Sequence, residues 1–127
     1  SEDAPATPKK QAVAAAALQK HLAAQLRNEG ATLQRDGQYN DALARYRESL
    51  SVMPDEELEE YAVKLETLLR KRAKRLADEG TELQRQKKYA EAVEKFRQSL
   101  VYYRTPKVEE HIRKLHLYME ALKRRQK

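Results

Sequence analysis

Apolar residues recur at three- and four-residue steps along most of the chain, the spacing that places side chains on one face of an α-helix. Short polar or proline-containing stretches interrupt this pattern, such as DGQ at 36–38, MPD at 53–55 and RTP at 104–106. The sequence therefore predicts an all-α fold of about five helices. Their predicted ranges are Lys9 to the DGQ stretch, Tyr39–Val52, Glu56 to about Gln86, Tyr89 to Tyr102 or Tyr103, and Pro106 or Lys107 to about Arg124.

The third predicted helix is unusually long. No proline interrupts residues 56–86 and one apolar seam continues through them, so we expect a single helix of about thirty residues. Asp55 is its predicted N-cap, and the acidic residues of its first turn complement the helix dipole. The seam consists of Leu58, Tyr61, Leu65, Leu68, Leu69, Leu76 and Leu83.

The sequence begins with SEDAPATPKK, a stretch that has no apolar period and mixes small, acidic and proline residues. Because this composition is typical of a linker, we predict a disordered tail at residues 1–8 and a helical domain at residues 9–127. The stretch is similar to spacers that follow export or lipid-anchor signals in bacterial envelope proteins. This similarity favours a periplasmic or envelope location over a cytoplasmic one.

The chain repeats itself at an offset of fifty residues. Aligned without gaps, residues 27–76 and 77–126 share fifteen identical positions. Such fixed-period similarity indicates stacked repeats, each of which buries its apolar face against the next. A glycine recurs inside predicted helices at Gly30 and Gly80, although it costs a helix about 1 kcal/mol relative to alanine, so we expect close helix contacts there. The small residues expected opposite these contacts are Ala42, Ser49, Ala92 and Ser99.

A family resemblance is carried by Gly30, Leu33, Tyr39, Ala42, Tyr46, Ser49 and Pro54, and again by Gly80, Leu83, Tyr89, Ala92, Phe96 and Ser99. In this order and spacing they resemble tetratricopeptide repeats. The resemblance covers residues 23–54 and 73–106, and it implies a fragment of an α-solenoid built from antiparallel helix pairs, with a capping helix at residues 107–125. The chain departs from the family in its period, which is fifty residues rather than about thirty-four.

The extra residues of this longer period fall near residues 55–72 and lengthen the front of the third predicted helix. Since first helices of successive repeats lie roughly parallel in the family, the resemblance implies that the three long helices form one layer, with the last of them as a cap. The leucines expected to hold this layer together are Leu18, Leu22, Leu58, Leu65, Leu68, Leu115 and Leu122.

The resemblance also implies a protein-interaction scaffold whose concave face, lined by the first helix of each pair, binds an extended or helical peptide. The positions that match this face are Ala24, Arg27, Ala31, Gln34, Lys74, Ala77, Thr81 and Gln84. The candidate partner-binding residues among them are the polar ones, Arg27, Gln34, Lys74, Thr81 and Gln84. They suit an acidic or polar peptide. Only Arg27 matches the family's carboxylate clamp for chaperone tails, so we do not expect that ligand.

The sequence offers little for catalysis. It contains no cysteine, and its glycines are isolated rather than grouped in a phosphate-binding loop. Its histidines, His21, His111 and His116, do not occur in a metal-binding spacing. We therefore predict no enzyme activity, no metal and no cofactor. No apolar run approaches the roughly 18 residues that a membrane span requires.

Two further functions stay open, one suggested by the formal net charge of +6 and one by the long apolar seam. Basic residues gather at 71–75 and 123–127, and the fifty-residue offset predicts that these clusters lie near each other, where they would attract nucleic acid or an anionic surface. The same charges also complement helix dipoles without any partner. Finally, the long apolar seam could pair between chains, which would make the protein a homo-oligomeric helical spacer.

Overall fold

The computed structural model describes residues 7–126, which form five α-helices and no strand. This confirms the all-α prediction, and the predicted helix boundaries differ from the observed ones by at most one residue. The helices are α1 (Pro8–Arg35), α2 (Tyr39–Val52), α3 (Glu56–Arg85), α4 (Tyr89–Tyr102) and α5 (Pro106–Arg125).

Three of the helices begin with a side-chain cap. The side chains of Thr7, Asp55 and Thr105 accept hydrogen bonds from backbone N–H groups in the first turns of α1, α3 and α5. Proline occupies the first position of both α1 and α5, where its missing N–H costs nothing. The predicted tail lies mostly outside the described residues, and its last member, Pro8, already belongs to α1.

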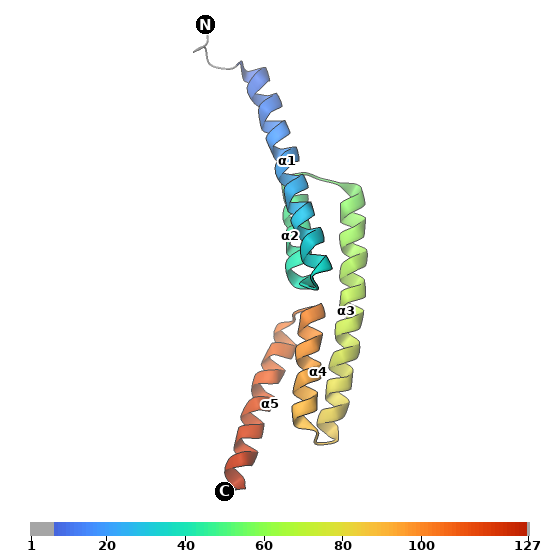
Figure 1. Cartoon of the computed structure of the whole chain (residues 1–127), viewed down its shortest axis with the longest axis vertical. Helices are drawn as coiled ribbons and strands as arrows, with labels where there is room; N and C mark the ends of the chain where they lie inside the picture. Colours follow the sequence, from blue (N-terminus) through green and yellow to red (C-terminus); the bar gives the residue numbers. More distant parts are fainter. Residues whose placement is uncertain (1–6, 127) are drawn as a thin grey trace.

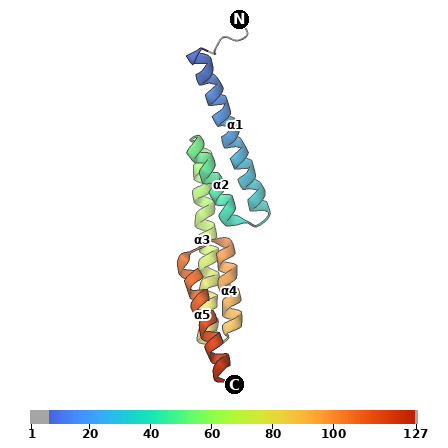
Figure 2. The ribbon, with the colours of Figure 1, turned by 90° about the vertical axis from the view of Figure 1, so that its left-hand side faces the viewer.

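The helices form an elongated molecule in which α1 begins at one end and α5 finishes at the other (Figure 1). The second half of α1 packs against α2, and the second half of α3 packs in the same manner against α4. The first half of α3 lies along the first of these pairs, and α5 lies along the second (Figure 2). The long helix α3 therefore runs through both halves of the molecule.

Each half has its own apolar core. The buried side chains around α2 are Ala42, Leu43, Tyr46, Leu58, Ala62, Leu65 and Leu69, and those around α4 are Ala92, Val93, Phe96 and Leu115. All four members of the second core align with members of the first at an offset of fifty residues. Because apolar burial is the dominant favourable term in folding, each half depends on this repeated set of contacts.

The prediction that the three long helices form one layer is wrong. α1 and α5 lie in opposite halves of the molecule, on either side of its middle (Figures 1 and 2). Leu58, Leu65 and Leu115 are buried as expected, but Leu18, Leu22 and Leu68 are 68%, 43% and 46% exposed and Leu122 is only partly covered. The physical reason is that the short helices α2 and α4 provide the apolar surface against which the buried leucines pack.

The first half of α1 extends beyond the end of α2, and every residue from Pro8 to Leu22 is exposed. The first half of α3 aligns with this half of α1 at the offset of fifty residues, and its side chains Leu58, Leu65 and Leu69 pack against a helix pair. The residues of α1 that align with these leucines are Pro8, Ala15 and Gln19. This half of α1 therefore lacks the large apolar side chains with which α3 covers its neighbour.

Gly30 and Gly80 lie at close contacts between the two helices of each pair. A Cβ atom on Gly30 would lie 2.7 Å from the ring of Tyr46, and one on Gly80 would lie 2.9 Å from the ring of Phe96. Such distances are shorter than any side chain tolerates without movement of its neighbour. The predicted close contact is confirmed. An aromatic ring lies directly against each glycine, and the carbonyl oxygen of the small residue Ala42 also lies 3.2 Å from the Cβ position of Gly30.

The small residues on the short helices make a second recurring contact. The buried hydroxyl of Ser49 donates a hydrogen bond to the carbonyl of Ala23 at 2.7 Å, and that of Ser99 donates to the carbonyl of Ala73 at 2.8 Å. A larger side chain at either serine would push the helices apart. The same fifty-residue offset thus relates both the apolar and the polar contacts of the two pairs.

Replacing Gly80 by alanine tests the close contact. We expect the free energy of unfolding to fall by about 1 kcal/mol, because overpacking against the buried Phe96 ring outweighs the gain of about 1 kcal/mol in helix propensity. Urea unfolding followed by circular dichroism measures the change. In a Phe96→Leu background Gly80→Ala should become neutral or stabilising. Stabilisation by Gly80→Ala in the unaltered protein would contradict the account of this contact.

Candidate partner-binding clefts

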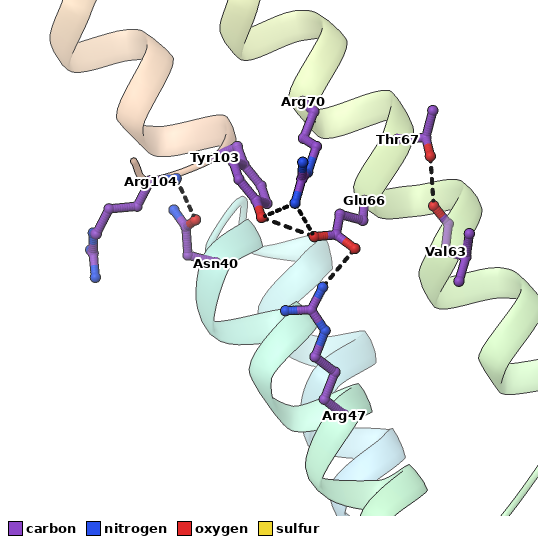
Figure 3. Close-up of polar contacts among 8 residues, drawn as sticks. All are labelled: Asn40, Arg47, Val63, Glu66, Thr67, Arg70, Tyr103 and Arg104. Carbon is purple, nitrogen blue, oxygen red and sulfur yellow. Dashed lines mark hydrogen bonds and ion pairs between the residues drawn. The ribbon is translucent and has the colours of Figure 1, made fainter. Parts of the chain in front are cut away.

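The two halves of the molecule meet at a polar cluster centred on Glu66 of α3 (Figure 3). Its carboxylate lies 2.7 Å from the guanidinium of Arg47 on α2 and 3.1 Å from that of Arg70 on α3. The hydroxyl of Tyr103, just after α4, donates a hydrogen bond to the same carboxylate at 2.9 Å and accepts one from Arg70 at 2.8 Å. This cluster links α2, α3 and the end of α4.

The cluster lowers the pKa of Glu66 from 4.5 to about 2. The hydrogen bond from Arg47 is the largest cause; desolvation opposes it, and hydrogen bonds from Tyr103 and Arg70 add to it. Charge-assisted hydrogen bonds of this kind are stronger than those between neutral groups. Glu66 is therefore a fixed negative charge at neutral pH, and it holds Arg70 and Tyr103 in place.

Asn40 at the beginning of α2 completes the junction. Its side-chain N–H donates to the carbonyl of Leu100 at 2.8 Å, and its amide oxygen accepts from the N–H of Arg104 at 2.8 Å, a contact drawn in Figure 3. A side chain from the first half thus satisfies backbone groups at the C-terminal end of α4, which have no partner within that helix. These contacts fix the orientation of one half relative to the other.

A first cleft, the α1–α3 cleft, lies between α1 and the beginning of α3 and has a volume of about 820 Å³. The Arg27 guanidinium on one wall lies 3.5 Å from the Asp55 carboxylate on the other. Inside, the amide oxygen of Gln34 accepts hydrogen bonds from the hydroxyls of Tyr46 and Tyr61 at 2.7 and 2.9 Å. The charged residues of the lining are Arg27, Arg35, Asp55, Glu57 and Arg72.

A second cleft, the α3–α5 cleft, lies between the middle of α3 and the beginning of α5 and has a volume of about 520 Å³. Its apolar lining consists of Ala73, Ala77, Phe96 and Val108, and its charged lining consists of Arg70, Lys74, Asp78 and Lys107. Three cations and one carboxylate therefore surround an apolar floor, which gives this cleft an excess of positive charge.

The five candidate partner-binding residues do not share one groove. Arg27 and Gln34 line the α1–α3 cleft, whereas Lys74 and Thr81 line the α3–α5 cleft. Gln84 lies at the end of the second cleft, where its amide oxygen is 2.6 Å from Nε2 of His111, a distance at which the ring N–H donates. The prediction from the sequence did not include the α5 wall of this cleft, because it placed the binding residues only on the first helix of each pair.

The two basic clusters are not neighbours, contrary to the prediction. Residues 71–75 lie in the middle of α3, whereas the described part of the second cluster forms the last turn of α5 at the far end of the molecule (Figures 1 and 2). The physical reason is that α5 continues past the end of α3 rather than lying beside its middle. The clusters therefore do not combine into one positive surface.

Residues 7–126 contain no group of three or more His, Asp or Glu side chains placed to hold a metal ion. Within the same range, no helix has the length and apolar character needed to cross a bilayer. Pairing of the long helices between copies of the chain stays a prediction.

Comparison with known proteins gave no match. A scan against protein-family models, a search of curated proteins and a search of solved structures each found nothing that matches this chain. The interpretation of the clefts therefore depends on their geometry and chemistry.

Proposed function

We propose that the chain is a non-catalytic protein-interaction scaffold of the tetratricopeptide-repeat type, which binds an extended segment of a partner protein in the α3–α5 cleft. Support for the repeat comes from contacts that recur at a fifty-residue offset in the two helix pairs. These are the glycine–aromatic contacts, the serine–carbonyl hydrogen bonds, and the ion pairs Arg45–Glu29 at 3.4 Å and Lys95–Glu79 at 3.2 Å.

The chemistry of the α3–α5 cleft is the observation that carries the binding proposal. Peptide-binding sites combine apolar pockets with a few polar groups that fix orientation. Here the partly exposed Ala77 and Val108 side chains provide apolar surface, while Lys74 of α3 and Lys107 of α5 provide positive charge. A scaffold of this kind needs no catalytic group, because affinity arises from burial and charge complementarity.

Binding can be tested with the whole chain and an array of random ten-residue peptides. We expect a subset of peptides with shared sequence features to bind, and Lys74→Glu to weaken their binding by about fivefold or more, because it reverses a charge at the cleft. Lys10→Glu, an equal charge reversal on the exposed first half of α1, is the matched control and should change little. Absence of any selected peptide, or equal loss with both variants, would contradict the proposal.

A further inference from the structure

The two clefts are repeat equivalents, and one difference between them is an ion pair that spans the walls of the first one. In the α1–α3 cleft, Arg27 and Asp55 link the two walls at 3.5 Å. The equivalent residues of the α3–α5 cleft are Ala77 and Thr105, neither of which carries a charge. The second cleft is therefore open at the place where the first is bridged by its own side chains.

Further differences in the lining add two lysines and one carboxylate to the second cleft. Glu57 of the first cleft corresponds to Lys107, and Asn28 corresponds to Asp78. Lys74 lines the second cleft, although its repeat equivalent, Ala24, does not line the first. Within the described part of the chain Lys107 has no ion-pair partner, and Lys74 contacts only Asp78 on its own helix at 2.9 Å, a pair whose side chains are largely exposed. Exposed pairs of this kind are weak, so Lys74 is free to exchange Asp78 for another carboxylate.

The neutral polar groups of the α3–α5 cleft are already used within the protein. Ser99 donates to the carbonyl of Ala73, Thr81 donates to the carbonyl of Ala77 at 3.0 Å, and Thr105 caps α5 by accepting from the N–H of Val108. His111 is hydrogen-bonded to Gln84. The groups left for a ligand are thus the two lysine ammonium groups and the apolar floor.

We propose that the α3–α5 cleft, and not the α1–α3 cleft, receives an acidic segment of the partner protein. A carboxylate of that segment lies between Lys74 and Lys107, and a neighbouring apolar side chain lies on Ala77 and Val108, the partly exposed apolar residues of the lining. This inference rests on the proposed function and adds to it the chemistry of the bound segment and the choice between two equivalent clefts.

The test exchanges the repeat-equivalent residues. The double variant Thr105→Asp, Lys107→Glu gives the second cleft the acids that the first cleft has at Asp55 and Glu57. Asp55 itself caps α3, so aspartate at position 105 keeps a capping group for α5, and an unchanged thermal midpoint checks this. Arg27→Glu is the matched control in the α1–α3 cleft.

The probe is a fluorescein-labelled peptide selected from the random array by the unaltered chain, with affinity measured by anisotropy. We expect selected peptides to combine acidic and large apolar residues. The double variant should bind about tenfold more weakly or worse, and Arg27→Glu should bind within about twofold of the unaltered chain. Affinity of the unaltered chain should fall as salt is added, because screening weakens contacts between exposed charges.

Each other outcome overturns a defined part of the account. If the chain selects neutral or basic peptides, the inference is overturned and the scaffold function stands. The same holds if an acidic peptide binds the double variant as tightly as it binds the unaltered chain. If Arg27→Glu weakens peptide binding more than the double variant does, the binding site is the α1–α3 cleft, and the inference is overturned. Failure of the chain to select any peptide would overturn the scaffold function and the inference together.

Discussion

Replacing Leu115 by aspartate is expected to lower the melting temperature by more than about 10 °C, or to unfold the chain at 25 °C. Leu115 is 4% exposed and belongs to the core of the second half, with Val93 and Phe96. An aspartate there would be an unpaired charge in an apolar site, a change that costs several kcal/mol of a total stability of about 5–15 kcal/mol. Leu65→Asp should act similarly in the first half.

Leu117→Asp is the matched control for this experiment. Leu117 lies on the same helix, two residues further on, but is 63% exposed. The same chemical change should alter stability there by no more than about 0.5 kcal/mol. Thermal melting by circular dichroism compares the variants. An unchanged midpoint for Leu115→Asp, or an equal drop for Leu117→Asp, would contradict the described core.

Replacing Glu66 by glutamine should destabilise the junction between the two halves at neutral pH. A folded pKa of about 2 against an ordinary value of 4.5 sets an upper limit of about 3 kcal/mol on the contribution of the ionised carboxylate. Since 21% of the side chain is exposed to solvent, which screens the charges, we expect a loss of about 1–2 kcal/mol. Urea unfolding at pH 7 measures it.

The sign of the pH dependence follows from the lowered pKa of Glu66. The contribution of this carboxylate is fully present above pH 4.5 and is lost as the pH falls towards 2, because protonation removes the charge that Arg47 and Arg70 contact. The difference in stability between the unaltered chain and Glu66→Gln should therefore shrink across this interval and become small near pH 2.

Glu82→Gln is the control for the pH series. The Glu82 carboxylate also has a lowered pKa, chiefly through a hydrogen bond from Gln86 with a further contribution from Arg85, but these partners lie within four residues of it on the surface. Loss of such a local, exposed contact should change stability little at any pH. A Glu66→Gln variant as stable as the unaltered protein at pH 7 would show that the cluster does not hold the junction.

The helices were predictable from the sequence because their signals are local. Apolar spacing, the Asp55 cap and the proline at the first position of α5 all act within one or two turns. The junction was not predictable, since Asn40 contacts backbone groups of Leu100 and Arg104 more than fifty residues away. No spacing along the chain indicates such a contact. The prediction of one layer of long helices was wrong for the same reason. Local spacing along the chain does not indicate which halves of the long helices contact each other.

The candidate site was predicted only in part for a related reason. Arg27 and Lys74 were equally plausible cations in the sequence, but the fold places an acid, Asp55, opposite Arg27 and places Lys74 in a cleft that Lys107 also lines. A signal for this difference was present in the aligned repeats, where Asp55 corresponds to Thr105 and Glu57 to Lys107. The exchanges indicate a difference between two binding clefts only when the structure shows that these positions line equivalent clefts.

The most direct test of the central claim is an amide shift map by nuclear magnetic resonance of the whole chain, titrated with an acidic peptide selected from the array. The account predicts that the largest shifts fall on residues 70–81 of α3 and residues 105–111 just before and within α5, which line the α3–α5 cleft. Shifts concentrated on the α1–α3 cleft, on the exposed first half of α1 or on the last turn of α5 would contradict it.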